Sequence, residues 1–270
     1  MKLLNRLLIA ILIMLTIVTL FRNMTWLTGV TLNMDIAKKT PKKARGWINL
    51  GVNYYKEKDY DNAIKYLEKA IKIDPRYPHT YVTIGRIYVK QKKYKIAFDY
   101  YKKAVKEDDS FSPAYEALAD LFKELKNREK ETFFLEQIMD KGKNEDKNNF
   151  KVLLRLGKNY IELKNPEKAL KYNLKAYELN QNDYNVLTNL GVAYSLNKEY
   201  EKAEPLLKRG IDIKPNDGKA YNNLGILYYR IGEKEKAIKI LTKGYEMSKS
   251  KTVLRSLNII KDRIKKGENK

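Results

Sequence analysis

The chain contains no cysteine and only one histidine, His79. The absence of cysteine excludes disulfide bonds, thiolate metal sites and cysteine nucleophiles. A single histidine leaves too few ligands for a zinc site, and no G-x-S-x-G, P-loop or H-E-x-x-H motif occurs. We therefore expect no metal site, no cofactor and no catalytic residues, and we interpret His79 as a surface residue.

Proline and glycine are also scarce, with 7 and 13 among 270 residues, so little of the chain can be low-complexity linker. Hydrophobic residues make up 43% of the chain and charged residues 33%, which is typical of a folded helical protein.

Acidic residues are fewer than basic ones, 33 against 55, and the formal net charge is +22. Arginine provides only 11 of the 55 basic residues, whereas nucleic-acid surfaces are usually richer in arginine. Because the lysines are scattered over the whole chain, we expect no nucleic-acid partner. Two interpretations remain open: a solvated lysine-rich surface, or a field that favours an anionic partner such as lipid headgroups, an acidic protein or a wall polymer.

One long uncharged run is present, from Leu7 to Phe21. As a helix it would cover about 22 Å, short of the ~30 Å hydrocarbon core of a membrane. Inclusion of Leu3 and Leu4, with Arg6 reaching back to the interface, makes a span feasible. We predict that residues 1–22 form an uncleaved single-pass membrane anchor. A cleaved signal peptide and a buried core helix are the alternatives.

The flanks of this run favour the anchor. The stretch after Phe21 offers no small-residue cleavage site, and Trp26 would lie near the far interface. Three positive groups precede the run and only Arg22 follows it closely, which predicts that the rest of the chain is non-cytoplasmic. Signal cleavage would instead give a periplasmic or secreted protein. We interpret residues 23–43 as a tether, in which Pro41 disfavours a continuous helix.

Glycine recurs after Leu or Ile and three positions before Tyr, with steps of 34, 72, 34 and 34 residues. Ala119 occupies the glycine position inside the longer step. The recurring glycines are Gly51, Gly85, Gly157, Gly191 and Gly225. A fixed period in this range predicts a stacked repeat architecture.

The first repeat predicts two helices joined by a turn. Trp47, Leu50 and Tyr54 share one helical face, and Ala63, Leu67 and Ala70 share another. The residue before Pro75 avoids helical dihedral angles, so the second helix ends there. Glycine inside a helix costs about 1 kcal/mol relative to alanine, and we expect close packing of the second helix against Gly51 to offset this.

This pattern of Trp, Leu-Gly, Tyr, Ala, Leu, Ala and Pro resembles the tetratricopeptide repeat (TPR). The resemblance implies an all-α fold, a right-handed α-solenoid of about six helix-turn-helix repeats with a C-terminal cap helix. The expected repeats are residues 44–77, 78–111, 112–149, 150–183, 184–217 and 218–251, followed by a cap helix at 252–265 and a tail at 266–270. Tyrosines in the consensus positions, such as Tyr54 and Tyr88, are interpreted as core residues.

The third repeat departs from the pattern. Glu131 and Ile138 replace small residues, and four extra residues precede Phe150. We interpret this as a drifted repeat with a longer loop; the alternative is a hinge between repeats one to three and four to six. The stripe of Val253, Leu257, Ile260 and Ile264 predicts the cap helix that a solenoid needs at its end.

The resemblance also implies function, since most TPR arrays hold a partner peptide or helix in the concave groove of their first helices. Placed on this chain, the groove positions are Arg45, Ile48, Val52, Tyr55, Lys56, Val82, Arg86, Val89, Lys90, Asn185, Thr188, Val192, Lys219, Asn222, Ile226, Tyr229 and Arg230. Val52 and Ile48 stand in two positions of the carboxylate clamp that some TPR domains use, so we expect no such clamp there.

We therefore expect a non-catalytic scaffold that is tethered at a membrane and binds protein partners. The alternatives are a binding module for an anionic envelope polymer or lipid surface, and an accessory subunit of a separate enzyme.

Overall fold

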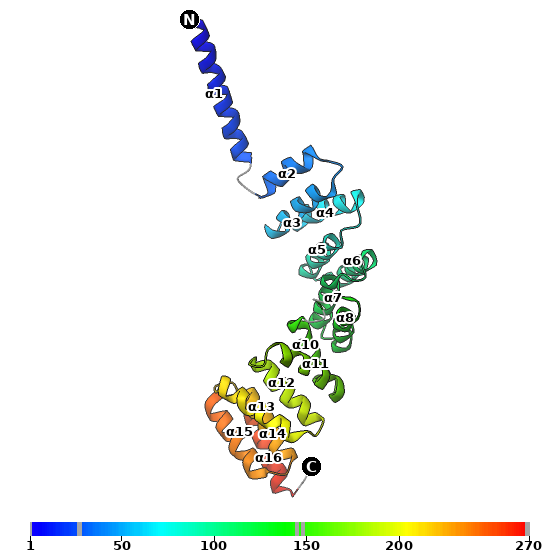
Figure 1. The fold of residues 1–270 in the computed structure, drawn as a ribbon, viewed down its shortest axis with the longest axis vertical. Helices are drawn as coiled ribbons and strands as arrows, with labels where there is room; N and C mark the ends of the chain where they lie inside the picture. Colours follow the sequence, from blue (N-terminus) through cyan, green and yellow to red (C-terminus); the bar gives the residue numbers. More distant parts are fainter. Residues whose placement is uncertain (1, 26–28, 144–145, 147–148, 268–270) are drawn as a thin grey trace. The chain divides into compact units, whose positions relative to one another are not determined.

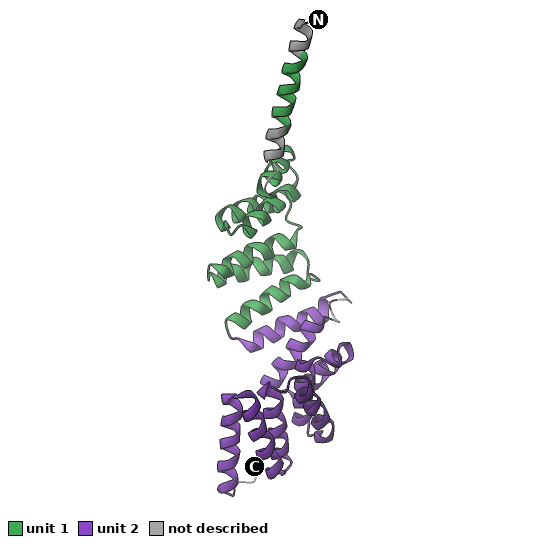
Figure 2. Cartoon of the chain, turned by 90° about the vertical axis from the view of Figure 1, so that its left-hand side faces the viewer, with its two compact units in different colours: residues 1–125 green, residues 126–270 purple. Residues whose placement is uncertain are grey.

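The computed structural model describes residues 2–25, 29–143, 146 and 149–267, and all regular elements in these ranges are α-helices. The chain separates into two compact units, residues 1–125 and 126–270 (Figure 2). The division lies between the two helices of the predicted third repeat, and not at its longer loop.

Unit 1 contains seven helices among its described residues (Figure 1). They are α1 (Lys2–Thr25), α2 (Gly29–Lys39), α3 (Ala44–Lys56), α4 (Tyr60–Ile73), α5 (Pro78–Lys90), α6 (Tyr94–Glu107) and α7 (Ser112–Glu124). Helices α3 and α4 form one antiparallel pair, and α5 and α6 the next, as the repeat pattern predicts.

Unit 2 contains eight helices among its described residues. They are α8 (Arg128–Lys141), α10 (Phe150–Glu162), α11 (Pro166–Leu179), α12 (Tyr184–Leu196), α13 (Tyr200–Ile213), α14 (Gly218–Arg230), α15 (Lys234–Ser248) and α16 (Lys251–Lys265). The pairs α10/α11, α12/α13 and α14/α15 repeat the same arrangement, and α16 packs on both α14 and α15.

The recurring glycine permits close helix packing, as expected. A Cβ atom added at Gly51 would lie 2.6 Å from Leu67 Cγ of the second helix, and one at Gly85 would lie 2.3 Å from Tyr101 Cε1. Real Cβ atoms do not make such contacts, so the side chain of the second helix occupies the space that glycine leaves open.

The turn inside each repeat has a feature that the sequence pattern did not reveal. A lysine adopts a left-handed backbone conformation just after the first helix, with φ between 56° and 64°. The residues are Lys58, Lys92, Lys126, Lys164 and Lys198, and Gly232 takes the equivalent place in the last repeat. This conformation is ordinarily the preference of glycine, so the turns carry a modest local strain.

The interpretation of residues 23–43 as a tether is wrong for residues 29–39. They form α2, which packs on α3 and buries Ala37 against Gly46. Val30 and Met34 pack on the cluster around Trp47, and Asn53 Nδ2 donates to the Gly29 carbonyl at 2.8 Å. The helix ends before Pro41, as expected.

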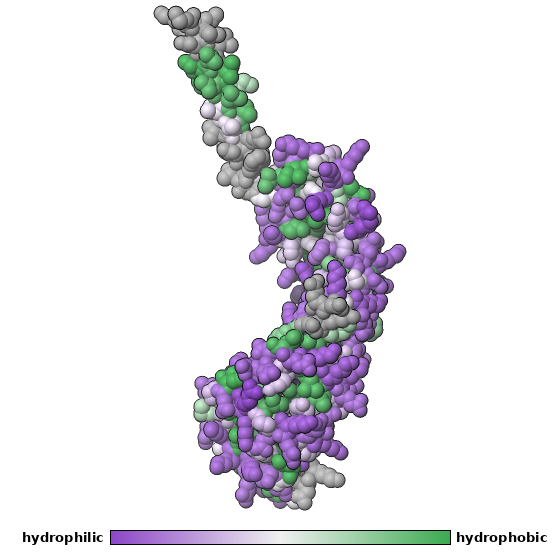
Figure 3. Space-filling model, viewed as in Figure 1, coloured by the Kyte–Doolittle hydropathy of each residue, from purple (hydrophilic) through white to green (hydrophobic). Residues whose placement is uncertain are grey.

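The N-terminal run forms α1, and the side chains described in it, residues 8–19, are all exposed and largely apolar (Figure 3). The alternative of a buried core helix is therefore wrong for these residues. Among the residues whose placement is described, no helix is both long enough and apolar enough to cross a membrane. Trp26 lies outside the described residues, and so do the side chains of Arg6 and Arg22.

The predicted cap helix is observed as α16. Val253, Leu257 and Ile260 are buried against α14 and α15, and Ile264 is half-buried. The opposite face, with Arg255 and Lys261, is exposed. The helix therefore covers the last repeat and presents a polar outer face.

Candidate ligand grooves

Each unit has a groove face built by first helices that lie side by side. In unit 1, α5 contacts α3 and α7, and in unit 2 the order of contacts is α10, α12, α14 and α16. We call these faces the unit 1 groove and the unit 2 groove. A row of packed helices fixes the position of each side chain along the groove.

The predicted residues of the unit 1 groove differ in how far they are exposed to solvent. The exposed members are Arg45, Lys56, Arg86 and Lys90. The half-buried members are Ile48, Val52, Tyr55 and Val89. Val82 is buried, with 2% of its surface exposed, so it supports the floor and offers little surface to a ligand.

Four of these residues meet in one hollow of about 340 Å³ in unit 1. Its lining comprises the predicted Tyr55, Arg86, Val89 and Lys90, together with Tyr101, Ala117, Asp120, Leu121 and Glu124. The aromatic ring of Tyr101 comes from the second helix and reaches the hollow over Gly85. Tyr101 was not among the predicted groove residues, because the repeat pattern draws these from the first helices only.

The predicted residues of the unit 2 groove also range from exposed to buried. Asn185, Lys219 and Arg230 are exposed, and Val192, Asn222, Ile226 and Tyr229 are half-buried. Thr188 is fully buried, and its hydroxyl donates to the Tyr184 carbonyl at 2.9 Å. Thr188 therefore belongs to the helix interior and not to the groove surface.

Two hydrogen bonds join neighbouring first helices across this groove. Lys219 Nζ donates to Asn189 Oδ1 at 3.0 Å, and Arg230 Nη1 donates to Ser195 Oγ at 3.3 Å. Although the Lys219 side chain as a whole is exposed, its ammonium group lies among the first helices. Desolvation there lowers the pKa of Lys219, and the positive charge of Lys158 on α10 lowers it further. The carboxylates of Asp217 and Asp183 act in the opposite direction, so burial is the main cause of the lowered pKa.

A second hollow, of about 380 Å³, lies between α14 and α16 in unit 2. Its lining comprises Ile226, Tyr229, Arg230, Ser256, Ile259, Ile260 and Arg263. The last four residues belong to the cap helix and were not among the predicted groove residues. Ile259 could have indicated this hollow from the sequence, because it is an apolar residue that lies outside the buried stripe of the predicted cap helix.

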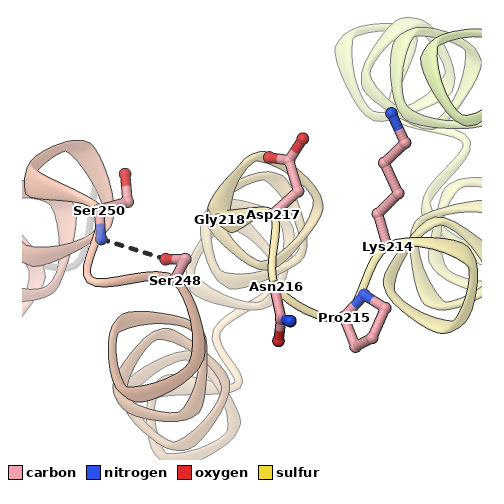
Figure 4. A pocket seen from close by; sticks show the side chains of 7 residues that line it. All are labelled: Lys214, Pro215, Asn216, Asp217, Gly218, Ser248 and Ser250. Carbon is pink, nitrogen blue, oxygen red and sulfur yellow. Dashed lines mark hydrogen bonds between the residues drawn. The ribbon is translucent and has the colours of Figure 1, made fainter.

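Unit 2 also has a polar hollow at its edge, where the turn before α14 meets the turn before α16 (Figure 4). Ser250 N donates to Ser248 Oγ at 3.2 Å, and a Cβ atom at Gly218 would lie 2.7 Å from the same oxygen. The Ser248 hydroxyl also donates to the Gly244 carbonyl within the last turn of α15. This hollow is therefore explained by the packing of the two turns.

The unusual Glu131 of the third repeat is the centre of a buried ion cluster in unit 2. Its side chain is 3% exposed, and Arg155 Nη2 lies 2.9 Å from one carboxylate oxygen. Arg128 Nη1 lies 3.4 Å from the other and also donates to Asn159 Oδ1 at 3.0 Å. Arg128 further pairs with Glu162. The larger residue is thus accommodated by charge pairing between α8 and α10.

A second polar cluster joins α8, α10 and α11. Lys168 Nζ lies 2.9 Å from Glu136 Oε1 and 3.1 Å from the Tyr160 hydroxyl, while the rings of Tyr160 and Tyr172 stack at 5.7 Å. Burial and the hydrogen bond to Glu136 raise the pKa of Tyr160 to about 12. Burial alone would raise the pKa of Glu136, but hydrogen bonds from Tyr160 and Lys168 hold it below its ordinary value.

We expect Glu136 to make unit 2 sensitive to acid. A carboxyl whose folded pKa is depressed stabilises the fold above its unfolded pKa, and loses this contribution as pH falls through the folded pKa. Glu136→Gln should cost about 1 kcal/mol at pH 7 because the pair is partly solvated, and clearly less at about pH 3. Urea unfolding at both pH values measures this, with the exposed Glu178→Gln as control. A pH-independent cost for Glu136→Gln would contradict the assignment.

Both the helix pairs and the groove faces define an α-helical repeat protein. Tetratricopeptide repeat models match residues 44–77, 78–111, 150–183 and 185–250, together more than half of the chain. The chain therefore belongs to the tetratricopeptide repeat family, as its sequence pattern indicated.

Solved structures of this family share the fold. YrrB, described as a TPR protein with an unusual peptide-binding site, is 22% identical, with 72% of this chain and 97% of YrrB covered and a TM-score of 0.63. The C-terminal part of a TPR repeat-containing protein from Cytophaga hutchinsonii is 20% identical, with 84% and 93% covered and a TM-score of 0.61. The structure of pilF from Pseudomonas aeruginosa is 18% identical, with 80% of this chain and 96% of pilF covered and a TM-score of 0.56. No curated protein matches the sequence.

Proposed function

We propose that this protein is a non-catalytic scaffold whose grooves hold a peptide or helix of a partner protein. The observation that carries the proposal is the arrangement of the groove residues: basic side chains are exposed beside half-buried apolar ones on helices that pack side by side. Such a surface offers anchoring pockets and charge recognition together. YrrB, which has a similar fold, is described as having a peptide-binding site, and this supports the same use of the fold here.

Charge reversal on the groove tests this proposal. We expect Arg86→Glu combined with Arg230→Glu to reduce recovery of a crosslinked partner about tenfold, because both residues are exposed on the groove faces. The matched control is Lys106→Glu with Lys243→Glu, which makes the same change in net charge at exposed positions of second helices. An equal loss in both double variants would show that net charge, and not the groove, governs binding, and would favour the anionic polymer or lipid alternative.

We further propose that residues 1–22 anchor the protein in a membrane, with the repeats on the non-cytoplasmic side. The support is the apolar run with its basic N-terminal flank, and the exposure of every described side chain in residues 8–19. The full chain is expected to pellet with membranes, to resist carbonate extraction and to be cut by protease only when the outer side is accessible. A soluble product shortened by about 25–30 residues would instead identify a signal peptide.

A further inference from the structure

The hollow between α14 and α16 has an apolar surface that packing of the cap does not explain. The capping stripe of α16 is already buried in the core of unit 2. Ile259 lies outside that stripe, remains 43% exposed and faces the hollow with Ile226 and Tyr229 of α14. A volume of about 380 Å³ is large enough for one or two side chains of a ligand.

The charge around this apolar surface has one sign. Arg230 and Arg263 line the hollow from the two helices, and none of its described lining residues is acidic. Lys219 lies on the same helix as Arg230, eleven positions earlier, or roughly 16 Å along the axis at ~1.5 Å per residue. Its ammonium group donates to Asn189 Oδ1 of α12 at 3.0 Å, so Lys219 places a third basic group on this face, with Asp217 and Asp183 as the nearby acidic groups.

We infer that this hollow binds a partner segment in which an apolar side chain is flanked by carboxylates. The apolar side chain would enter between Ile226 and Ile259, and the carboxylates would pair with Arg230 and Arg263. A further acidic residue about five positions away in an extended chain, at ~3.3 Å per residue, would reach Lys219. The inference rests on the proposed function, because it names the chemistry of the segment that the unit 2 groove holds.

An extended peptide fits this site better than a membrane surface. The apolar part of the site lies in an open hollow between two helices, and its arginines carry planar guanidinium groups that match single carboxylates in a fixed geometry. A bilayer surface would instead require charges spread over a flat face.

Fluorescence anisotropy with three labelled nonapeptides tests the inference. The probe EEGSGELFE carries both features, QQGSGQLFQ lacks the charge, and EEGSGEASE lacks the apolar anchor. With the full chain in nonionic detergent, and detergent alone as blank, we expect EEGSGELFE to bind at least tenfold more tightly than either of the others. Comparable binding of QQGSGQLFQ or EEGSGEASE would overturn the inference.

Variants locate the binding. Arg263→Gln and Ile259→Ser should each weaken binding of EEGSGELFE about fivefold to tenfold, and Arg255→Gln, on the exposed face of the same helix, should leave it unchanged. Circular dichroism confirms that the variants remain folded. Equal effects of Arg255→Gln and Arg263→Gln would mean non-specific charge attraction and would contradict the site. A change from dimer to monomer on Ile259→Ser, seen by sedimentation, would assign the hollow to a second copy of the chain and overturn the inference.

The experiments distinguish failure of this inference from failure of the proposed scaffold function. If no nonapeptide binds but partner crosslinking still maps to the groove faces, the acidic-apolar segment is wrong and the scaffold function stands. If neither binding nor groove crosslinking occurs, both are wrong.

Discussion

Replacement of Glu131 by alanine should destabilise unit 2 by about 3 kcal/mol. Alanine stands at this position in the other repeats, so the repeat pattern alone would favour the change. In this chain, however, the carboxylate lies between Arg155 at 2.9 Å and Arg128 at 3.4 Å, and it is 3% exposed. Removal of one partner from a buried ion cluster leaves the remaining charge unpaired, which typically costs about 3–5 kcal/mol. We expect the lower end of this range because Arg128 is partly exposed.

Urea unfolding followed by circular dichroism measures this effect. Glu167→Ala is the matched control, because Glu167 is an exposed glutamate of α11 and its loss should change stability by about 0.5 kcal/mol or less. Glu131→Gln, which retains size and a hydrogen-bond acceptor, should fall between wild type and Glu131→Ala. A neutral or stabilising Glu131→Ala would show that the consensus residue, and not the ion cluster, is what α8 and α10 need.

Alanine at Gly85 should lower the free energy of unfolding by about 2 kcal/mol, even though alanine favours a helix by about 1 kcal/mol over glycine. The new methyl group would lie 2.3 Å from Tyr101 Cε1 and 2.6 Å from its Cδ1. Tyr101 is 2% exposed, so its ring has little room to move aside. The steric cost therefore exceeds the gain in helix propensity.

Gly210→Ala is the control for this prediction. Its methyl group would lie 3.2 Å from Thr188 Cγ2 and 3.4 Å from Ala220 Cβ, so small adjustments suffice and stability should hardly change. A double-mutant cycle then isolates the contact: in a Tyr101→Ala background, Gly85→Ala should no longer be destabilising. A persistent cost in that background would mean that the backbone at residue 85, and not the Tyr101 ring, requires glycine.

The repeat architecture could be predicted because the same short-range residue pattern recurs in each repeat. Gly51, Leu67 and Pro75 predict a close helix pair and its end from short-range spacing alone, and the structure has that pair. Helix α2 was missed because polar residues and Pro41 dominated the interpretation of its segment. The spacing of Val30, Met34 and Ala37 was a helical signal that could have identified it.

The parts of the site that the sequence did not predict depend on contacts between distant residues. Glu131 was interpreted as drift because its partner Arg155 lies 24 residues away, beyond the longer loop. Tyr101 and Ile259 line the two hollows because of how neighbouring helices pack, which the repeat pattern does not encode. Conversely, Val82 and Thr188 occupy groove positions by pattern but are buried, and both stand at the fifth residue of their repeats.

Site-specific photo-crosslinking tests the central claim, that the partner lies in the grooves. Benzoylphenylalanine would replace Tyr55 or Tyr229, which line the hollows of units 1 and 2, and Lys106 or Lys243 on the second helices. In cells expressing the full chain, we expect discrete crosslinked species at Tyr55 and Tyr229, and none at Lys106 and Lys243. Crosslinks of equal yield at all four positions, or only at the second helices, would contradict the groove as the partner-binding surface.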